Sequence, residues 1–290
     1  MIPSTLISEG VAEAYKRAVT TLPEDIYNAI KAAREKETNP LAKWGLEIVI
    51  KNIDVAKEEA IPICQDTGVP EFFVKLGTKA TVDGSIEEAI KEGVIGMTKS
   101  FPLIPLAVHP LTRVNTLNNT GYRVPLTHYS LIPQADYIEL TAVPACAAPQ
   151  TFCAVKMYPS GTPITEAKKF ICETVHKITG AVCPPLVVGV GFGGLFGTVG
   201  LLAREASIRS LDVRHPDPEI AKLEDELLDS INKLGIGHMN LGGDITALAV
   251  NIEIGHTHSP CFPVAVQIQC WCCRRVTVRM HEDGRVDQLR

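Results

Sequence analysis

A long stretch without a charged side chain, residues 178–203, most strongly limits what this chain can fold into. About 20 apolar residues are enough to cross a bilayer as a helix, so a membrane span has to be considered. The stretch contains Pro184 and Pro185, followed by a series of glycines from Gly189 to Gly200, and both residue types interrupt helices. The sequence therefore predicts a buried strand near 186–190, then a turn and a core helix, and no membrane span.

Helix and strand signals are mixed along the rest of the chain. Thr-Leu-Pro-Glu at 21–24 and Ser-Ile-Glu-Glu at 85–88 are capping boxes, and Asn39-Pro40 combines an N-cap with a first-turn proline. The helices that these signals and two later prolines predict cover 21–37, 39–59, 85–99, 162–178 and 217–235. The strands predicted from β-branched and aromatic runs cover 72–76, 124–132, 137–143, 245–254, 262–269 and 275–280.

These elements do not alternate regularly as strand–helix–strand units, and the sequence contains no internal repeat. We therefore expect a mixed α/β (α+β) fold, with a helical N-terminal third and strand-rich middle and C-terminal parts. Residues 102–119 and 210–216 are rich in turn-forming residues and are the expected linkers. A single domain over residues 1–290 and a two-lobed arrangement both agree with this pattern.

Charge argues against several classes of partner. The formal net charge is −5, and no long basic run is present. Nucleic acid and an anionic membrane surface are therefore not expected as partners, whereas a small anionic substrate can still bind in a locally basic pocket. The hydrophobic fraction of 46% and the charged fraction of 21% are typical of a globular protein with its own core.

The nine cysteines raise the question of which thiols carry chemistry. Their number is odd, and the N-terminus, MIPSTLISEGVAEAYKR, lacks the cationic start and apolar centre of a secretory signal. We therefore expect a cytoplasmic location, where thiols are buried, catalytic or bound to metal rather than paired. Cys64, Cys183 and Cys270 are so far apart in sequence that a metal site using them would assemble only on folding.

Three segments combine a thiol with residues suited to a functional site. Cys64-Gln65-Asp66-Thr67-Gly68 follows a helix stop, Cys183 precedes two prolines, and Cys270-Trp-Cys-Cys-Arg-Arg ends a predicted strand. The arginines beside the last thiols favour the thiolate form. One C-x₂-C pair without a second makes a zinc-finger interpretation weak. From composition alone, a turn in which Asp66 bonds to local backbone and Cys64 packs is the favoured explanation of the first segment.

Arg113 and a histidine pair are further candidates. Arg113 lies in a polar loop, where its guanidinium fork suits a carboxylate, although a solvated surface charge is the alternative. His256 and His258 lie in a predicted strand or edge loop, where alternation would point both to the same face, and such a pair is more often structural than a metal site.

A dinucleotide site is a competing interpretation. Gly189, Gly191 and Gly194 match the pattern G-x-G-x-x-G, and Asp212 lies near the place of a ribose-binding acid. Asp212 is in a predicted loop, however, whereas the dinucleotide motif requires the acid at the end of a strand. A nicotinamide- or flavin-dependent oxidoreductase is therefore kept as an alternative function.

Taken together, the motifs resemble the α-subunits of iron–sulfur hydro-lyases, which are the class I fumarate hydratases and the L(+)-tartrate dehydratases. The order and spacing of the motifs agree with that family over nearly the whole chain. The matching segments are residues 52–68, 108–113, 183–191, 213–218, 234–237, 241–243 and 263–275.

The resemblance implies a [4Fe–4S] cluster with three thiolate ligands and one open iron that acts as a Lewis acid on the substrate. The implied residues are the metal ligands Cys64, Cys183 and Cys270, the catalytic residues Asp66 and His258, and the substrate-binding residues Gln65 and Arg113. The implied reaction is the reversible dehydration of a small 2-hydroxy dicarboxylate. Fumarate and malate are the expected pair, and L(+)-tartrate is the alternative substrate.

The resemblance also implies a β-subunit and an αβ pair that dimerises. Two departures from the family pattern bear on activity. Residues 145–151 read Ala-Cys-Ala-Ala-Pro-Gln-Thr where the family has Lys-Gly-Gly-Gly-Ser-Glu-Asn, and residues 238–240 read His-Met-Asn where it has Pro-x-Gly. A non-catalytic homologue that keeps the cluster is therefore a further alternative. Cys146, inside the first altered loop, is a candidate for an additional thiol near the site.

Overall fold

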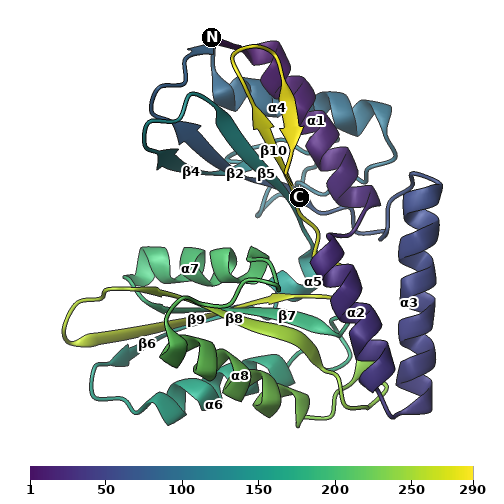
Figure 1. Ribbon diagram of the computed structural model, residues 1–290, viewed down its shortest axis with the longest axis vertical. Helices are drawn as coiled ribbons and strands as arrows, with labels where there is room; N and C mark the ends of the chain where they lie inside the picture. The colour runs from purple at the N-terminus through teal and green to yellow at the C-terminus, as the bar shows by residue number, and fades with distance from the viewer. Residues whose placement is uncertain (290) are drawn as a thin grey trace. The chain divides into compact units, whose positions relative to one another are not determined.

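The computed structural model describes residues 1–289, and it divides the chain into two compact units. Unit 1 consists of Met1–Pro23, Ile53–Ala147 and Arg274–Arg290, and unit 2 consists of Glu24–Asn52 and Ala148–Cys273. Each unit is thus assembled from segments that are far apart in sequence. Both units combine helices with a sheet (Figure 1), so the expected mixed α/β fold is confirmed.

Unit 1 contains a five-stranded sheet. Its strands, in spatial order, are β11 (Val286–Gln288), β10 (Val276–Met280), β5 (Ile138–Ala145), β2 (Val69–Gly77) and β4 (Leu126–Ile132). The pair β2–β4 is parallel, and the other neighbours are antiparallel. A separate parallel pair joins β1 (Ile2–Pro3) to β3 (Val82–Asp83).

Helices α1 (Ser4–Thr20) and α4 (Ile86–Ser100) pack on each other and supply the apolar core of unit 1 (Figure 1). The core joins one face of these helices to inward side chains of the sheet, such as Phe72 and Leu140. The Ser85 hydroxyl accepts a hydrogen bond from the Glu88 N–H, which satisfies a backbone donor that the first turn would leave unpaired. The predicted helix and the Ser85 half of its capping box are therefore confirmed.

Unit 2 contains a four-stranded sheet in the order β6 (Ala154–Pro159), β9 (Cys261–Gln269), β7 (Leu186–Gly193) and β8 (Ala247–Gly255). Helix α7 (Phe196–Ile208) covers one face of the sheet, and α6 (Ile164–His176) and α8 (Pro218–Asn232) cover the other (Figure 1). Every residue of β7 is buried, which explains the uncharged stretch as a core strand, a turn and a helix. Among residues 1–289, no helix is long and apolar enough to cross a membrane.

The remaining helices are α2 (Glu24–Lys36), α3 (Pro40–Glu58), the short α5 (Ala147–Gln150) and the 3-10 turn η1 (His238–Asn240). The Asn39 side chain accepts hydrogen bonds from the backbone N–H groups of Leu41 and Ala42, as expected for an N-cap. Strand β6 was not predicted, because Ala-Val-Lys-Met-Tyr-Pro alternates weakly and ends in a proline. It pairs only with β9, at the edge of the sheet.

Candidate functional site

The segment that carries Cys64, Gln65 and Asp66 is held in place by hydrogen bonds within unit 1. The buried Tyr15 hydroxyl donates to the carbonyl oxygens of Gly68, at 2.8 Å, and Thr67, at 3.1 Å. Gly68 has φ +82°, and a Cβ added there would lie 2.7 Å from the Pro144 carbonyl carbon. Glycine is therefore required at this position, both for its backbone conformation and for the close approach of β5.

Asp66 uses both carboxylate oxygens to organise this segment. Oδ1 accepts a 2.9 Å hydrogen bond from the Gly68 N–H, and Oδ2 accepts a 2.8 Å bond from the Ala147 N–H. Ala147 is the first residue of α5 and lies in the altered segment 145–151, so this segment still supplies a backbone donor despite its changed sequence. Cys64 and Asp66 are partly buried, whereas Gln65 is exposed.

A buried cation lies beneath the same segment. The Arg274 side chain is 1% exposed, and its Nη2 donates to the Asp66 carbonyl oxygen, at 2.8 Å, and to Cys146 Sγ, at 2.9 Å. Burial raises the pKa of the Cys64 thiol, and the Arg274 charge opposes this shift. Sequence reasoning treated Arg274 only as a charge beside the last thiols and did not predict that it would reach residues 66 and 146.

Arg113 lies in the long loop between α4 and β4. Its guanidinium side chain is exposed, its backbone has φ +61°, and its N–H donates to the His109 carbonyl oxygen. The start of this loop is hydrogen-bonded to the Cys64 segment, because the Ile104 N–H donates to the Thr67 hydroxyl at 3.1 Å. The buried Asn119 side chain bonds to the backbone of Ile104 and Leu106, so the predicted linker is an ordered loop.

Cys183 and Cys270 are brought together at one end of the sheet of unit 2. Strands β7 and β9 are antiparallel, with Val187 opposite Gln269, so the residues before β7 meet those after β9. The Trp271 N–H donates to the Cys183 carbonyl oxygen at 3.1 Å, which joins the two cysteine segments directly. Cys270 is 9% exposed, and Cys183 is partly exposed.

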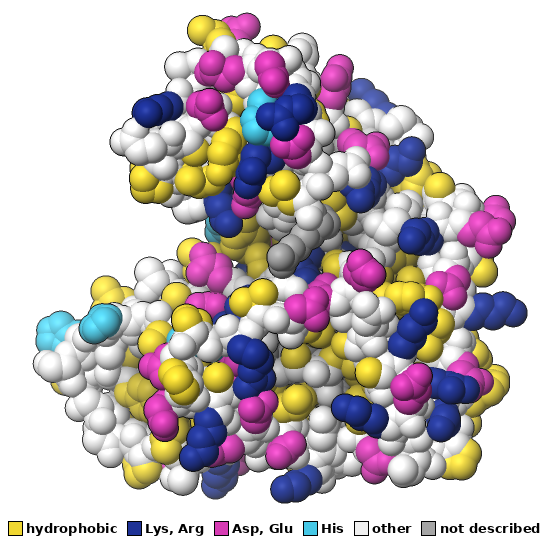
Figure 2. All heavy atoms as spheres, viewed as in Figure 1, with side chains coloured by type: hydrophobic (Ala, Val, Ile, Leu, Met, Phe, Trp, Pro, Cys, Tyr) yellow, Lys and Arg dark blue, Asp and Glu magenta, His cyan; other side chains and the backbone are white. Residues whose placement is uncertain are grey.

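His258 lies at the opposite end of that sheet. It is exposed in the turn that joins β8 to β9, and Figure 2 shows histidine side chains on the surface at this end of unit 2. The length of β9 separates it from Cys270 by about 30 Å, at roughly 3.3 Å per residue. The structure therefore does not bring His258 to the pair of cysteines in its own chain, and its catalytic role stays a prediction from the resemblance.

The glycine pattern of the dinucleotide interpretation has a packing explanation. Gly189 and Gly191 lie inside β7, where added Cβ atoms would collide with the carbonyl oxygens of Ala203 and Val199 in α7. The dinucleotide motif places its glycines in the turn after the strand. Asp212 is in a turn of the 210–217 segment and not at the end of a strand. The geometry thus favours close strand–helix packing over a nucleotide site.

None of the nine cysteines forms a disulfide. Over the described range 1–289, no group of three His, Cys, Asp or Glu side chains is gathered around the position of a single metal ion. A [4Fe–4S] cluster has different demands, because each thiolate binds its own iron and the sulfurs need not converge on one point. The paired segments of Cys183 and Cys270 fit two of three such ligands by chemistry and placement.

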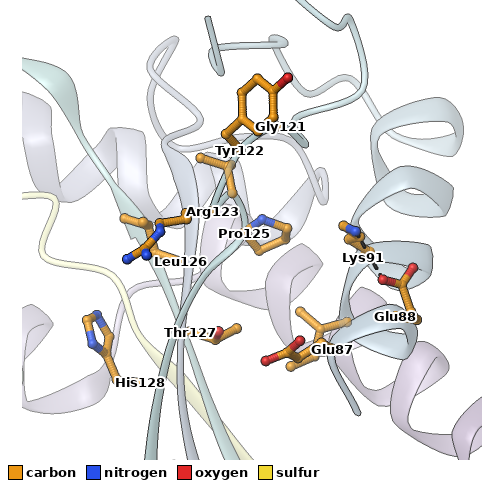
Figure 3. A pocket seen from close by; sticks show the side chains of 12 residues that line it. Glu87, Glu88, Lys91, Gly121, Tyr122, Arg123, Pro125, Leu126, Thr127 and His128 are labelled. Carbon is orange, nitrogen blue, oxygen red and sulfur yellow. Dashed lines mark hydrogen bonds and ion pairs between the residues drawn. The ribbon is translucent and has the colours of Figure 1, made fainter. Parts of the chain in front are cut away.

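A separate cavity of about 670 Å³ lies beside the edge strand β4 of unit 1. Figure 3 shows Glu88 and Lys91 of α4 on one side of it, and Arg123 and His128 on the other. The described residues that line this cavity differ from those predicted for the site. Its lining contains both basic and acidic side chains, and Lys91 forms an ion pair with Glu88. The charge of the cavity therefore favours neither an anionic nor a cationic ligand.

Comparison with known proteins confirms the resemblance inferred from the motifs. A family model described as fumarate hydratase (Fumerase) matches residues 8–279. A Methanocaldococcus jannaschii protein provisionally named L(+)-tartrate dehydratase subunit alpha is 43% identical over 283 residues, covering 97% of this chain and 99% of that protein. An Escherichia coli L(+)-tartrate dehydratase subunit alpha is 32% identical over 286 residues, covering 98% and 93% respectively. This chain therefore belongs to the fumarate hydratase (Fumerase) family.

Proposed function

We propose that this chain is the α-subunit of a [4Fe–4S]-dependent hydro-lyase that interconverts malate and fumarate. The observation that carries the proposal is the register of β7 and β9 in a chain of this family, which sets Cys183 beside Cys270. Cys64 is the third proposed ligand. When bound, the cluster would supply an open iron that polarises the hydroxyl group to be lost.

The remaining roles belong to side chains near Cys64 and on the segment between α4 and β4. Gln65 is exposed and able to donate or accept hydrogen bonds to substrate. Asp66 is oriented by the N–H groups of Gly68 and Ala147, so its remaining lone pairs point in fixed directions for proton transfer or substrate binding. The exposed Arg113 guanidinium is suited to a substrate carboxylate through paired hydrogen bonds.

L(+)-tartrate is the second candidate substrate. The names of the M. jannaschii and E. coli relatives favour it, whereas the description of the family model names fumarate hydratase. Both reactions remove water from a 2-hydroxy dicarboxylate, so the same residue types serve either substrate. The relatives are named as alpha subunits, and we propose a β-subunit as the partner of this chain, in an αβ pair that dimerises. A cytoplasmic location stays a prediction from the sequence.

The proposal is tested by co-expressing the chain anaerobically with a β-subunit and measuring iron and sulfide per α-chain. Turnover is then assayed with malate, fumarate and L(+)-tartrate. We expect bound iron and sulfide with turnover of at least one of the three. Nicotinamide binding without iron would refute the proposal. Iron without turnover on any of them would instead favour the non-catalytic homologue.

Single serine substitutions test the ligand set. Cys64→Ser, Cys183→Ser and Cys270→Ser should each abolish stable cluster binding, because a hydroxyl is a poor ligand for iron in such clusters. Cys172→Ser is the matched control, since Cys172 is a partly buried thiol on α6 with no proposed role. Cluster loss in the control, or retention in any of the three variants, would show that the ligand assignment is wrong.

A further inference from the structure

The second departure from the family pattern, at residues 238–240, contacts the segment that carries Cys183. These residues form the 3-10 turn η1 in unit 2. Met239 and Asn240 both adopt the left-handed conformation, with φ of +50° and +63°. Residues other than glycine rarely adopt this backbone conformation, although asparagine tolerates it better than most. A strained turn at this place therefore calls for a compensating interaction.

The Asn240 side chain supplies such an interaction by spanning the residues before Cys183. Its Oδ1 accepts a 2.9 Å hydrogen bond from the Gly180 N–H, and its Nδ2 donates at 3.1 Å to the Val182 carbonyl oxygen. One side-chain amide thus links η1 to the backbone of Gly180 and Val182, and we call this pair of hydrogen bonds the Asn240 bridge. A glycine at position 240 would keep the backbone conformation but make neither bond.

Two backbone hydrogen bonds hold the following residues. The Met239 N–H donates to the Pro184 carbonyl oxygen at 3.2 Å, and the Trp271 N–H donates to the Cys183 carbonyl oxygen at 3.1 Å. Together with the Asn240 bridge, these bonds pair the Gly180 N–H and the carbonyl oxygens of residues 182, 183 and 184. The backbone of Cys183 is thereby held from the η1 side and from the Cys270 side.

The turn itself is anchored in unit 2. The His238 side chain is 2% exposed and packs against Gly45 of α3 so closely that an added Cβ at Gly45 would collide with its ring. Gly237, with φ +67°, approaches the Gly242 carbonyl just as closely. Because the turn is anchored by this packing, the Asn240 bridge can transmit that rigidity to the Cys183 segment.

We propose that Asn240 is a positioning residue that pre-organises Cys183 for ligand binding. The residue replaces the glycine expected from the family pattern, and it exchanges backbone freedom for two hydrogen bonds to the cysteine segment. Fixing a ligand before it binds lowers the entropy lost on binding. The inference rests on the proposed function only where Cys183 is taken as a cluster ligand. The rigidity of the segment is a property of the protein without a cluster.

The first experiment uses the α-chain without cluster. The rate at which iodoacetamide alkylates Cys183 is measured by peptide mass spectrometry in wild type and in Asn240→Gly. Loss of both hydrogen bonds of the bridge should raise this rate at least about tenfold, because even one net hydrogen bond corresponds to a change of about tenfold in a local opening equilibrium. Asn240→Asp keeps the acceptor for Gly180 but not the donor to Val182, so it should give a smaller increase. Alkylation of Cys172 should be unchanged in every variant.

Met239→Gly is the matched control for flexibility of the turn. It relieves the same left-handed strain one residue away, but the backbone donor to Pro184 remains, and the Met239 side chain is 44% exposed. An equal rise in Cys183 alkylation in this control would overturn the proposal, as would a wild-type rate in Asn240→Gly. If Asn240→Gly fails to fold, Asn240→Asp decides: a wild-type rate in that variant also overturns the proposal.

The second experiment uses the cluster-loaded αβ enzyme. The rate of cluster loss in air, followed by visible absorbance, should rise in Asn240→Gly and not in Met239→Gly. Absence of iron from the wild type would count against the proposed function alone, because the alkylation rates still decide the role of Asn240. Faster alkylation with an unchanged rate of cluster loss would show that Asn240 orders the segment without assisting the ligand, and would overturn the positioning role.

Discussion

Replacing Tyr15 with phenylalanine removes one hydroxyl from beneath the Cys64 segment and changes little else. Tyr15 is fully buried, and its ring packs against Phe72 with centroids 6.1 Å apart, a contact that the ring of the substituted phenylalanine would retain. The hydroxyl donates to the carbonyl oxygens of Gly68 and Thr67. Burial raises the pKa of Tyr15 well above its ordinary value, so the group stays protonated and remains a donor.

The magnitude follows from the number of protons donated. A single O–H serves both carbonyl oxygens, so the substitution removes about one buried hydrogen bond and leaves no cavity larger than an oxygen atom. The expected loss in free energy of unfolding is about 1–2 kcal/mol. At about 2–4 °C per kcal/mol for a chain of this size, the Tm should fall by about 2–8 °C.

Urea denaturation followed by circular dichroism measures the loss, and hydrogen exchange at residues 64–69 locates it. Tyr122→Phe is the matched control, since Tyr122 lies in the same unit and is 92% exposed, and it should change stability by less than about 0.5 kcal/mol. Equal effects of the two substitutions would refute the hydrogen-bond argument. A loss in Tyr15→Phe without faster exchange at residues 64–69 would show that the hydroxyl does not hold the Cys64 segment.

Two further predictions concern unit 1. Gly68→Ala should lower the free energy of unfolding by more than about 1 kcal/mol, because φ is +82° and the new Cβ would collide with Pro144. Thermal melts of this variant are compared with those of Gly161→Ala, where nothing lies within 4 Å of an added Cβ. Similar Tm values for the two variants would contradict the prediction. Burial of Glu139 opposes its ionisation, but hydrogen bonds from Lys75 and Arg279 outweigh this and lower its pKa below the ordinary 4.5. The stabilising effect of the Glu139 carboxylate is therefore present above about pH 4.5 and lost as the pH falls through the lower, folded-state pKa. The stability difference between wild type and Glu139→Gln, measured by urea titration, should shrink over that pH range. A difference independent of pH would contradict the assignment.

Local structure was largely predictable from the sequence because its causes are local. The Ser85 cap bonds to a residue three positions away, and the predicted helix 85–99 agrees with α4 at Ile86–Ser100. The uncharged stretch 178–203 likewise became a buried strand and a core helix, since its prolines and glycines exclude one continuous helix. The edge strand β6 was not predicted because its own sequence alternates weakly, and its ladder is formed with β9, which is distant in sequence.

The composition of the candidate site was partly predictable. The motifs identified the family and drew attention to Cys64, Cys183 and Cys270, and the antiparallel pairing of β7 with β9 accounts for the proximity of the last two segments. His258 lies at the other end of the sheet because it precedes β9, whereas Cys270 follows β9. Which other segment lies beside Cys270 depends on how the strands pair, and spacing along the chain does not reveal that.

The sequence by itself determined the family, the mixed α/β class, the N-caps at Ser85 and Asn39, and the candidate thiols. The capping box predicted at 21–24 was wrong, because α2 begins at Glu24 and the Thr21 hydroxyl donates to the Arg17 carbonyl oxygen at the end of α1. Only the tertiary structure decided how these residues are held. Arg274 reaches Asp66 across 208 positions, and Asn240 reaches Val182 across 58. No local pattern encodes such contacts, since they exist only once distant segments have packed and buried polar groups must find partners. The physical reason is that capping and periodicity act within a few residues, whereas the rigidity of a site depends on long-range hydrogen bonds.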